Sequence, residues 1–413
     1  MQWLVVGVTL LTLGAIVARP RGLGEAWAAA TGGAAMLLLG AVVPADLLAI
    51  GRETSDVLLF LLGMMVLTWL VEQAGVFDWL ADRVAALAGG SGPRLFALVF
   101  ALAAVVTALL SLDVTVLILT PIVYALTTRR RLDALPFMFA CTFVANTGSL
   151  ILPISNLTNL LVYSGLRLDF GAFAARMWLP NLVALLVNFA VFRWLFRGSL
   201  PARFAAATDD LPLVDWWFRS AALILAATLM VLLVAGLVHS SLAWPALAGG
   251  GLLLLIGLLG RRVGFGATAR SVSWPLFVFV IGMFILVRGF EHFWLEQLAF
   301  HLPTSPLPAL LLAVGANAIG SNIVNNVPMT LLSLPFIAHA GAGVQEPLAY
   351  GTLVGTNIGP TLTTYGSLAT MLWLTLIRKR GLDVTTGAYL RVALVTTPIV
   401  LVATTLTLWV MLR

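Results

Sequence analysis

Long apolar runs separated by short polar segments extend over the whole chain. The first three runs cover residues 3–18, 27–50 and 56–74, with a polar turn at residues 51–53 between the last two. A run of about 20 apolar residues is long enough to cross the hydrocarbon core of a bilayer as a helix. Because the first run is followed, and not preceded, by arginines, we expect a retained helix instead of a cleaved signal peptide. The pattern predicts a polytopic, all-helical membrane protein.

Two segments are too charged to cross a bilayer but keep helical spacing of their apolar positions. Residues 75–89 carry Asp78, Asp82 and Arg83, while their apolar residues recur on one helical face. A second such arm is expected near residues 290–301, after a span at 274–289. Amphipathic helices of this kind lie along the membrane interface.

Two apolar runs are interrupted by polar residues near their middle. In residues 94–128 the interruption is Ser111-Leu112-Asp113, and in residues 307–338 it lies between Asn322 and Pro328. We predict a re-entrant hairpin for each run, with two half-length helices that meet at a polar tip. For residues 94–128 the alternative is one span that tolerates an aspartate.

Two further runs contain glycine, proline and amide residues where an ordinary membrane helix would be unbroken. They cover residues 136–163 and 348–377. Backbone amide and carbonyl groups that lack a helical partner at membrane depth are tolerated only where protein or a hydrated cavity satisfies their hydrogen bonds. Discontinuous helices of this sort form the midplane sites of secondary transporters. For the second run taken alone, a glycine-kinked structural helix is the simpler alternative.

The two halves of the chain repeat the same plan. With an offset of 211 residues, Asn146 aligns with Asn357 and Gly148 with Gly359. We therefore predict a first repeat at residues 1–196, a linker at 197–216 and a second repeat at 217–413. The remaining spans are expected at 177–196, 218–238, 243–260 and 389–411.

Five spans in each half is an odd number, so the second repeat must be inverted in the membrane. With this topology 18 of the 23 Lys and Arg residues fall on one face. The positive-inside rule makes that face cytoplasmic and places both termini and all four histidines outside. The residues left on the outer face are Arg52, Arg167, Arg176, Arg288 and Arg413.

Composition narrows the function further. The chain has 413 residues, of which 61% are hydrophobic and 10% charged, and its mean hydropathy is +1.05. These values exclude a soluble protein, and the net charge of +6 reflects loops between spans more simply than nucleic-acid binding. The single cysteine, Cys141, excludes an intrachain disulfide and a multi-thiolate metal site. We find no paired nucleophile and base, so we expect neither an enzyme nor a cofactor.

The candidate site lies at the polar interruptions. Asp113 is the one acidic residue expected deep in the membrane, and a low-dielectric environment favours its neutral form, which suits a proton carrier. Its alternative role is to cap the second helix of the hairpin. No deep Arg or Lys is expected, which favours a neutral polyhydroxy solute or a cation over an organic anion. The candidate substrate-binding residues are Ser111, Asn146, Thr147, Ser149, Asn156, Asn325, Asn326, Asn357, Gly359, Thr361 and Ser367.

Several motifs resemble those of the arsenite permeases of the ArsB type, within the ion-transporter superfamily. They are LILTPIVYAL (117–126), ISNLTNLLV (154–162), NNVP (325–328) and IGPTLTTYGSLATMLW (358–373), and the similarity extends over nearly the whole chain. The resemblance implies export of arsenite and antimonite through the inner membrane in exchange for protons. It also implies an elevator-type motion and, in some relatives, docking of a cytosolic ATPase. The sequence leaves both a monomer and a homodimer open.

This sequence departs from the family pattern at three positions. Asn146 and Asn357 stand where relatives often have aspartate, and Thr361 where a lysine is common. Fewer groups can therefore carry protons. The rival function is a sodium-coupled carrier of a dicarboxylate, sulfate or phosphate, or a sodium/proton antiporter, with the same architecture. A channel would explain the duplicated broken helices less well.

Overall fold

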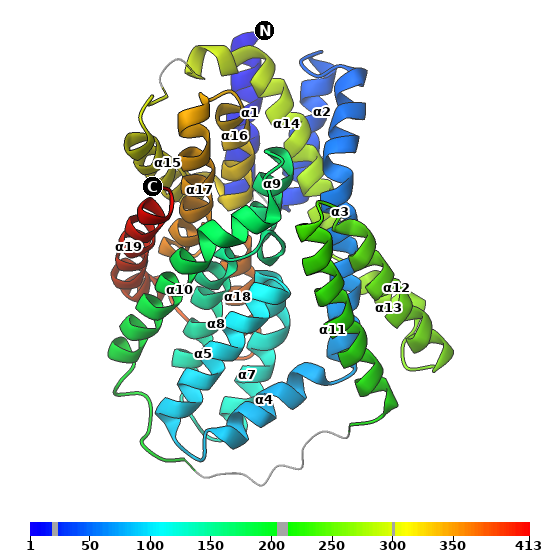
Figure 1. Ribbon diagram of the computed structural model, residues 1–413, viewed down its shortest axis with the longest axis vertical. Helices are drawn as coiled ribbons and strands as arrows, with labels where there is room; N and C mark the ends of the chain where they lie inside the picture. The colour runs from blue at the N-terminus through cyan, green and yellow to red at the C-terminus, as the bar shows by residue number, and fades with distance from the viewer. Residues whose placement is uncertain (19–23, 205–213, 300–301) are drawn as a thin grey trace.

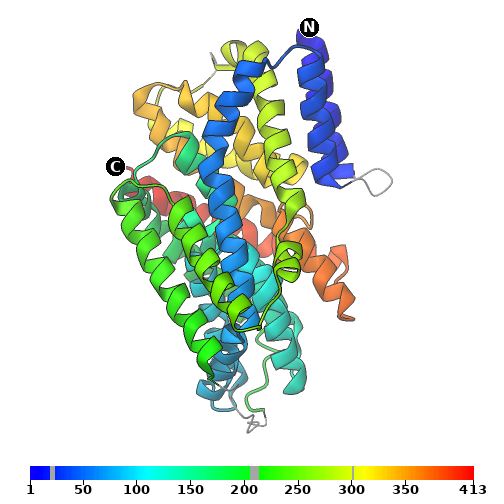
Figure 2. The ribbon, with the colours of Figure 1, turned by 90° about the vertical axis from the view of Figure 1, so that its right-hand side faces the viewer.

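The computed structural model describes residues 1–18, 24–204, 214–299 and 302–413, and these residues form helices and connecting turns without a strand. Figures 1 and 2 show an elongated helical molecule, with the N-terminus at one end and α4 (Val76–Leu87) at the other. Eight helices among the described residues are long and apolar enough to cross a membrane. The predicted class, a polytopic all-helical membrane protein, is confirmed.

The described residues of the first half form ten α-helices. They are α1 (Gln2–Ala18), α2 (Glu25–Leu38), α3 (Pro44–Gln73), α4, α5 (Gly92–Leu109), α6 (Leu112–Val114), α7 (Thr120–Arg129), α8 (Leu135–Thr147), α9 (Leu157–Gly165) and α10 (Phe170–Leu195). A π-helical segment, Thr115–Leu119, joins α6 to α7, and two short 3₁₀ turns lie between α8 and α9.

The second half has a closely similar order of elements. Its helices are α11 (Trp216–Leu237), α12 (Ala243–Leu259), α13 (Phe265–Ser271), α14 (Trp274–Ala299), α15 (Pro306–Val324), α16 (Asn326–Ala338), α17 (Ala342–Ile358), α18 (Leu368–Lys379) and α19 (Thr386–Met411). A 3₁₀ turn, Gly359–Leu362, follows α17. The short helix α13 was not expected from the sequence.

Two close helix crossings join the halves. Helix α3 packs against α12, and α2 packs against α14. A Cβ atom at Gly63 would lie 2.4 Å from the carbonyl carbon of Ala246, and one at Gly282 would lie 2.6 Å from that of Ala29. Only glycine allows backbones to approach this closely, as at the small-residue contacts of membrane helices. These four helices form a unit that we call the scaffold.

The remaining helices pack around the two interrupted segments. Helix α15 lies along α17, α5 along α8, and α10 along α19. The core behind them is largely aromatic, with Phe139, Phe143 and Tyr389 in mutual contact.

The predicted boundary between the second and third spans was wrong. The break lies at residues 39–43, and α3 continues through residues 51–53. Pro44 starts the helix with a preset φ, and the Val43 amide donates to Asp46 Oδ2 over 2.8 Å, which satisfies a free amide at the helix start. Farther along, Glu53 pairs with Arg288 of α14 at 2.8 Å. A tertiary contact therefore stabilises charged residues inside a helix, although the local sequence is typical of a turn.

The predicted arm at residues 290–301 was also wrong as a separate element. Helix α14 continues without a break from Trp274 to Ala299, and residues 300 and 301 lie outside the described part of the chain. In the first half, by contrast, Gly75 has a φ of +76° and ends α3 before α4 begins. Gly289 stands where the span in α14 was expected to end, but it does not have a positive φ and the helix continues through it.

Candidate functional site

A cavity of about 210 Å³ lies between α3, the tip between α5 and α6, the start of α9 and the start of α18. We call it the hairpin cavity. Its walls are mostly apolar and come from helices of the scaffold on one side and from the interrupted segments on the other. The polar residues that line it are Thr68, Glu72, Ser111, Asp113, Asn156, Ser271 and Ser273.

The charges of the hairpin cavity have one sign. Glu72 comes from α3 and Asp113 from the hairpin tip, and both side chains are half-buried. No Arg, Lys or His is among the described residues that line this cavity. A cavity with two carboxyl groups, several neutral oxygens and apolar walls repels anions and favours neutral or cationic solutes.

The tip of the first hairpin is held by hydroxyl groups. The Val114 amide donates to Ser111 Oγ over 3.4 Å, so Ser111 caps the helix that follows. The hydroxyl groups of Thr107 and Thr115 lie 2.7 Å apart across the tip. Within the described residues Asp113 makes no hydrogen bond or ion pair. The alternative role of Asp113 as the helix cap is therefore taken by Ser111, and the carboxyl group is left to face the cavity.

Asn357 joins the two interrupted segments. Its Oδ1 accepts from Asn156 Nδ2 at 2.5 Å and from Ser149 Oγ at 2.7 Å. Its Nδ2 donates to Asn159 Oδ1 at 2.9 Å and to the Leu353 carbonyl at 2.7 Å. These five side chains or backbone groups are buried. The hydrogen-bonding capacity of the Asn357 amide is thus filled by protein, and the group acts as a joint beside the cavity.

Asn156 connects this joint to the hairpin cavity. It lines the cavity, donates to Asn357, and its Oδ1 accepts from the Thr158 amide over 3.2 Å as the cap of α9. Asn156 would therefore link a solute in the cavity to Asn357, where the two interrupted segments are joined.

The tip of the second hairpin has a different geometry. Asn325 has a φ of +76° between α15 and α16, a conformation that costs about 1–3 kcal/mol for most non-glycine residues. Its Nδ2 donates to the Tyr365 carbonyl at 3.2 Å, and the Asn326 amide donates to the Gly366 carbonyl at 3.0 Å. The Gly359 carbonyl accepts from Asn322 at 2.7 Å. This tip is tied to the break between α17 and α18.

Three of the expected site residues carry buried polar atoms without a hydrogen-bond partner among the described residues. These atoms are Asn146 Oδ1, Asn326 Oδ1 and Ser367 Oγ. Buried polar groups are normally satisfied, so each has capacity to accept a hydrogen bond from a solute or a water molecule. None of the three residues lines the hairpin cavity as described here.

Two other expected residues are turned away from the cavity. Thr147 accepts from Asn188 of α10 at 2.9 Å. The Thr361 hydroxyl lies 2.8 Å from that of Thr397 on α19, and its carbonyl accepts from Tyr389 at 2.9 Å. Both residues fasten an interrupted segment to the helix behind it.

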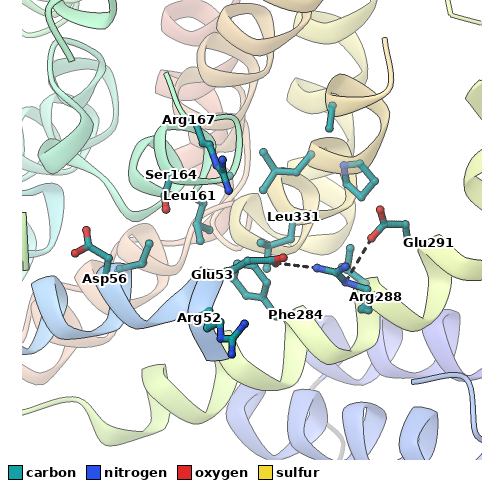
Figure 3. A pocket seen from close by; sticks show the side chains of 16 residues that line it. Arg52, Glu53, Asp56, Leu161, Ser164, Arg167, Phe284, Arg288, Glu291 and Leu331 are labelled. Carbon is teal, nitrogen blue, oxygen red and sulfur yellow. Dashed lines mark hydrogen bonds and ion pairs between the residues drawn. The ribbon is translucent and has the colours of Figure 1, made fainter. Parts of the chain in front are cut away.

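A larger cavity of about 550 Å³ lies nearer the start of α3, toward the end of the molecule that carries the N-terminus. We call it the arginine cavity. It is lined by Arg52, Arg167 and Arg288, three of the five basic residues that the sequence analysis placed on the outer face. Figure 3 shows Arg288 joined to Glu53 and Glu291, while Arg167 extends from the end of α9 into the space beside α3.

A thin apolar layer separates the two cavities. Along α3, Val57 lines the arginine cavity and Phe60 the hairpin cavity, and along α9, Leu161 and Leu160 do the same. Side chains one turn or less apart therefore face different cavities. The two cavities and this layer lie between helices of the scaffold and the hairpins and interrupted segments.

Four polar residues of the hairpin cavity were not expected from the sequence, namely Thr68, Glu72, Ser271 and Ser273. Thr68 and Glu72 lie one helical turn apart on α3, so both face the same side. Glu72 was expected at the end of a span and outside the site. The one signal in the sequence was that Glu72 stands four residues after Thr68, on an otherwise apolar face of the helix. Among the described residues no three His, Cys, Asp or Glu side chains are grouped as a metal site.

Comparison with known proteins gives a consistent family assignment. The family model described as "Citrate transporter" matches residues 13–355. An arsenical pump membrane protein of Escherichia coli is 28% identical, with 96% of each chain covered. A putative arsenical pump membrane protein of Bacillus subtilis is 25% identical, with 94% of each covered. These relatives confirm the resemblance to the arsenite permeases that the sequence motifs indicated.

Two solved structures share the fold at low sequence identity. The YdaH transporter of Alcanivorax borkumensis is 14% identical with a TM-score of 0.56, and the match covers 88% of this chain and 86% of that one. MtrF of Neisseria gonorrhoeae, described as one of a class of antimetabolite efflux pumps, is 12% identical with a TM-score of 0.55. That match covers 87% of this chain and 83% of the other. Both neighbours place the fold among membrane transporters.

Proposed function

The chain belongs to the citrate transporter family, and from this premise we propose that it exports arsenite and antimonite from the cytoplasm in exchange for protons. The observation that carries the proposal is the lining of the hairpin cavity. Its two carboxyl groups, hydroxyl groups and amide can bind a neutral hydroxylated solute and a proton. The arsenical pump relatives point to the same solute.

Arsenite suits this lining because it is mostly an uncharged trihydroxide at neutral pH. Its hydroxyl groups both donate and accept hydrogen bonds, as do Ser111, Asn156 and Thr68. Such contacts are weak enough to permit release on the far side. Thiolate ligation is not needed, since Cys141 is buried in α8 and does not line the cavity.

A carrier of citrate or another small anion, coupled to sodium, is the second candidate because of the family description. The lining of the hairpin cavity argues against an anionic solute. A carboxylate solute would enter a low-dielectric space that already holds Glu72 and Asp113, with no cation among the described lining residues. Like charges in such surroundings repel strongly. The arginines of the other cavity could attract an anion but lie beyond the apolar layer.

The proposal includes an inverted duplication. The two glycine crossings support it, because the pair Gly63 and Ala246 and the pair Gly282 and Ala29 exchange places when the halves are swapped. The tips at Ser111 and Asn325 are likewise equivalent, and each residue caps the helix that follows it. On this basis the cytoplasmic face is the end with α4, and both termini lie outside.

Transport would proceed by an elevator-type motion. The hairpins and interrupted segments would move against the scaffold and carry the solute across the apolar layer between the two cavities. The Asn357 joint supports this division because it binds the two interrupted segments to each other and not to the scaffold. A cytosolic ATPase partner remains a prediction from the family resemblance.

The test is arsenite accumulation in everted inner-membrane vesicles. Uptake should follow an imposed proton gradient, collapse with a protonophore and be insensitive to a sodium gradient and to excess citrate. Uptake of citrate driven by sodium, without arsenite uptake under either gradient, would replace this proposal with the anion carrier.

A further inference from the structure

Glu72 and Asp113 face one cavity from opposite sides of the proposed moving boundary. Asp113 belongs to the hairpin tip, whereas Glu72 belongs to α3, which the Gly63 crossing fixes to α12. Within the described residues neither carboxyl group has an ion-pair or hydrogen-bond partner. We propose that Glu72 sets the ease with which Asp113 releases its proton to the cytoplasm. The inference rests on the proposed proton-coupled export.

The physical basis is competition for charge in a small apolar space. Two carboxyl groups around one cavity cannot both ionise freely, and they share protons as a coupled pair. No described Arg, Lys or His lines the cavity to offset their charges. Ionised Glu72 would therefore oppose the ionisation of Asp113 in the conformation described here.

The surroundings of Glu72 add further negative charge and little that offsets it. On α4 the nearest acidic neighbour is Asp78, whose charge acts on Glu72, and beyond it Asp82 is paired with Arg129 at 3.3 Å. Around Asp113 the neighbouring helices α5 and α8 contribute no charged lining residue. Glu72 is thus the ionisable group best placed to act on Asp113.

The effect should be confined to one side of the membrane. If the hairpin moves away from α3 during transport, Asp113 leaves Glu72 behind and meets a different environment on the outer side. Glu72 would then delay proton release only where the proton must leave, at the cytoplasmic face. It acts as a positioning residue, since in this role it need not touch the solute.

The experiment measures arsenite transport by purified protein in oriented proteoliposomes, with the pH of each side varied independently. Wild-type export should rise with cytoplasmic pH as Asp113 loses its proton. Glu72→Gln should move the midpoint of this rise to lower pH by about one unit, while the midpoint for the outer side stays unchanged. Glu72→Asp should keep the wild-type midpoint.

The matched control is Asp46→Asn, which neutralises an acid at the opposite end of the same helix, outside both cavities. Asn can still accept from the Val43 amide, and neither midpoint should move. An unchanged cytoplasmic midpoint in Glu72→Gln, or equal shifts on both sides, would overturn the inference. So would inactivity of both Glu72 variants. A wild-type protein with no pH-dependent arsenite transport would instead contradict the proposed function.

Discussion

Ser149 Oγ and Asn357 Oδ1 lie 2.7 Å apart although 208 residues separate them in the chain. Ser149 stands at the break after α8, and Asn357 in the last turn of α17. The contact ties the interrupted segment of one half to that of the other. Asn146, which aligns with Asn357 in the sequence, makes only a local side-chain bond within the described part of the chain, from Nδ2 to the Thr142 carbonyl. The junction is therefore asymmetric.

Asn357→Ala should destabilise the protein more than Asn146→Ala. Without the Asn357 amide, Asn156 Nδ2 and Asn159 Oδ1 lose a buried partner, at a cost of about 1–3 kcal/mol for each group left unsatisfied. Asn146→Ala removes one local bond and should cost less. The measurement is the melting temperature of each purified variant in the same detergent. Equal losses would argue against the asymmetric junction.

Asp113→Asn should reduce proton-driven arsenite accumulation to the level of vesicles without the protein. The amide is close in size to the carboxyl group, so insertion and melting temperature should stay near those of the wild type. Asp383→Asn, at a side chain that is 83% exposed, is the control and should transport normally. Full gradient-driven transport by a well-expressed Asp113→Asn protein would exclude Asp113 as the proton carrier.

Cys141→Ser should retain transport. The Cys141 side chain is fully buried in α8 and does not line either large cavity. The cost should be confined to stability, at about 1–3 kcal/mol for a buried hydroxyl group that does not find a full set of partners. Initial rates of arsenite uptake, normalised to folded protein, give the comparison. Loss of transport with normal folding would point to a thiolate mechanism.

Gly63→Ala and Gly282→Ala should each destabilise the scaffold by a similar amount. The new Cβ atom would meet backbone atoms at 2.4 Å and 2.6 Å respectively, and the forced separation of the helices should cost about 1–3 kcal/mol. Gly251→Ala in α12 is the matched control, because nothing lies within 4 Å of its Cβ position. It should be neutral or slightly stabilising, since alanine favours helix. The readout is thermal unfolding in detergent.

Asp215→Asn should lower the melting temperature at neutral pH but not in acid. A hydrogen bond from the Phe218 amide and the nearby Arg262 guanidinium hold the pKa of Asp215 below its ordinary value. A lowered pKa contributes stability above the unfolded value, about 3.9, and this contribution is lost as the pH falls through the folded value. The difference between variant and wild type should therefore shrink as the pH falls below the unfolded value and vanish once Asp215 is protonated in both states. A constant difference would show that the charge is not responsible.

Features that depend on local sequence could be predicted well. Ser111 and Asn325 interrupt apolar runs, and α5 and α15 end within two residues of these positions, at Leu109 and Val324. The amides and hydroxyl groups near each break also indicated polar chemistry at membrane depth. The duplication stays a prediction, which rests on glycine and asparagine residues that both halves keep at equivalent points.

The errors arose where contacts between distant segments decide the outcome. Residues 51–53 read as a turn, but α3 continues through them and Glu53 finds Arg288 on α14. Likewise, Asn146, Asn357 and Thr361 were expected in one site. The Asn357 amide instead makes its hydrogen bonds to neighbouring protein groups, and the Thr361 hydroxyl bonds to Thr397 on α19. The spacing of polar residues along the sequence does not show which polar group a side chain will contact in the folded protein.

The sequence by itself determined the class of the protein, its interrupted helices and its family, because hydrophobic length and backbone-breaking residues act locally. The tertiary structure alone decided the composition of the cavity. Glu72 reaches it because α3 crosses α12 at Gly63, and this crossing sets the rotation of the last turns of α3 toward the hairpin tip. Helix rotation depends on packing between distant segments, so the placement of Glu72 and Asp113 around one cavity appears only in three dimensions.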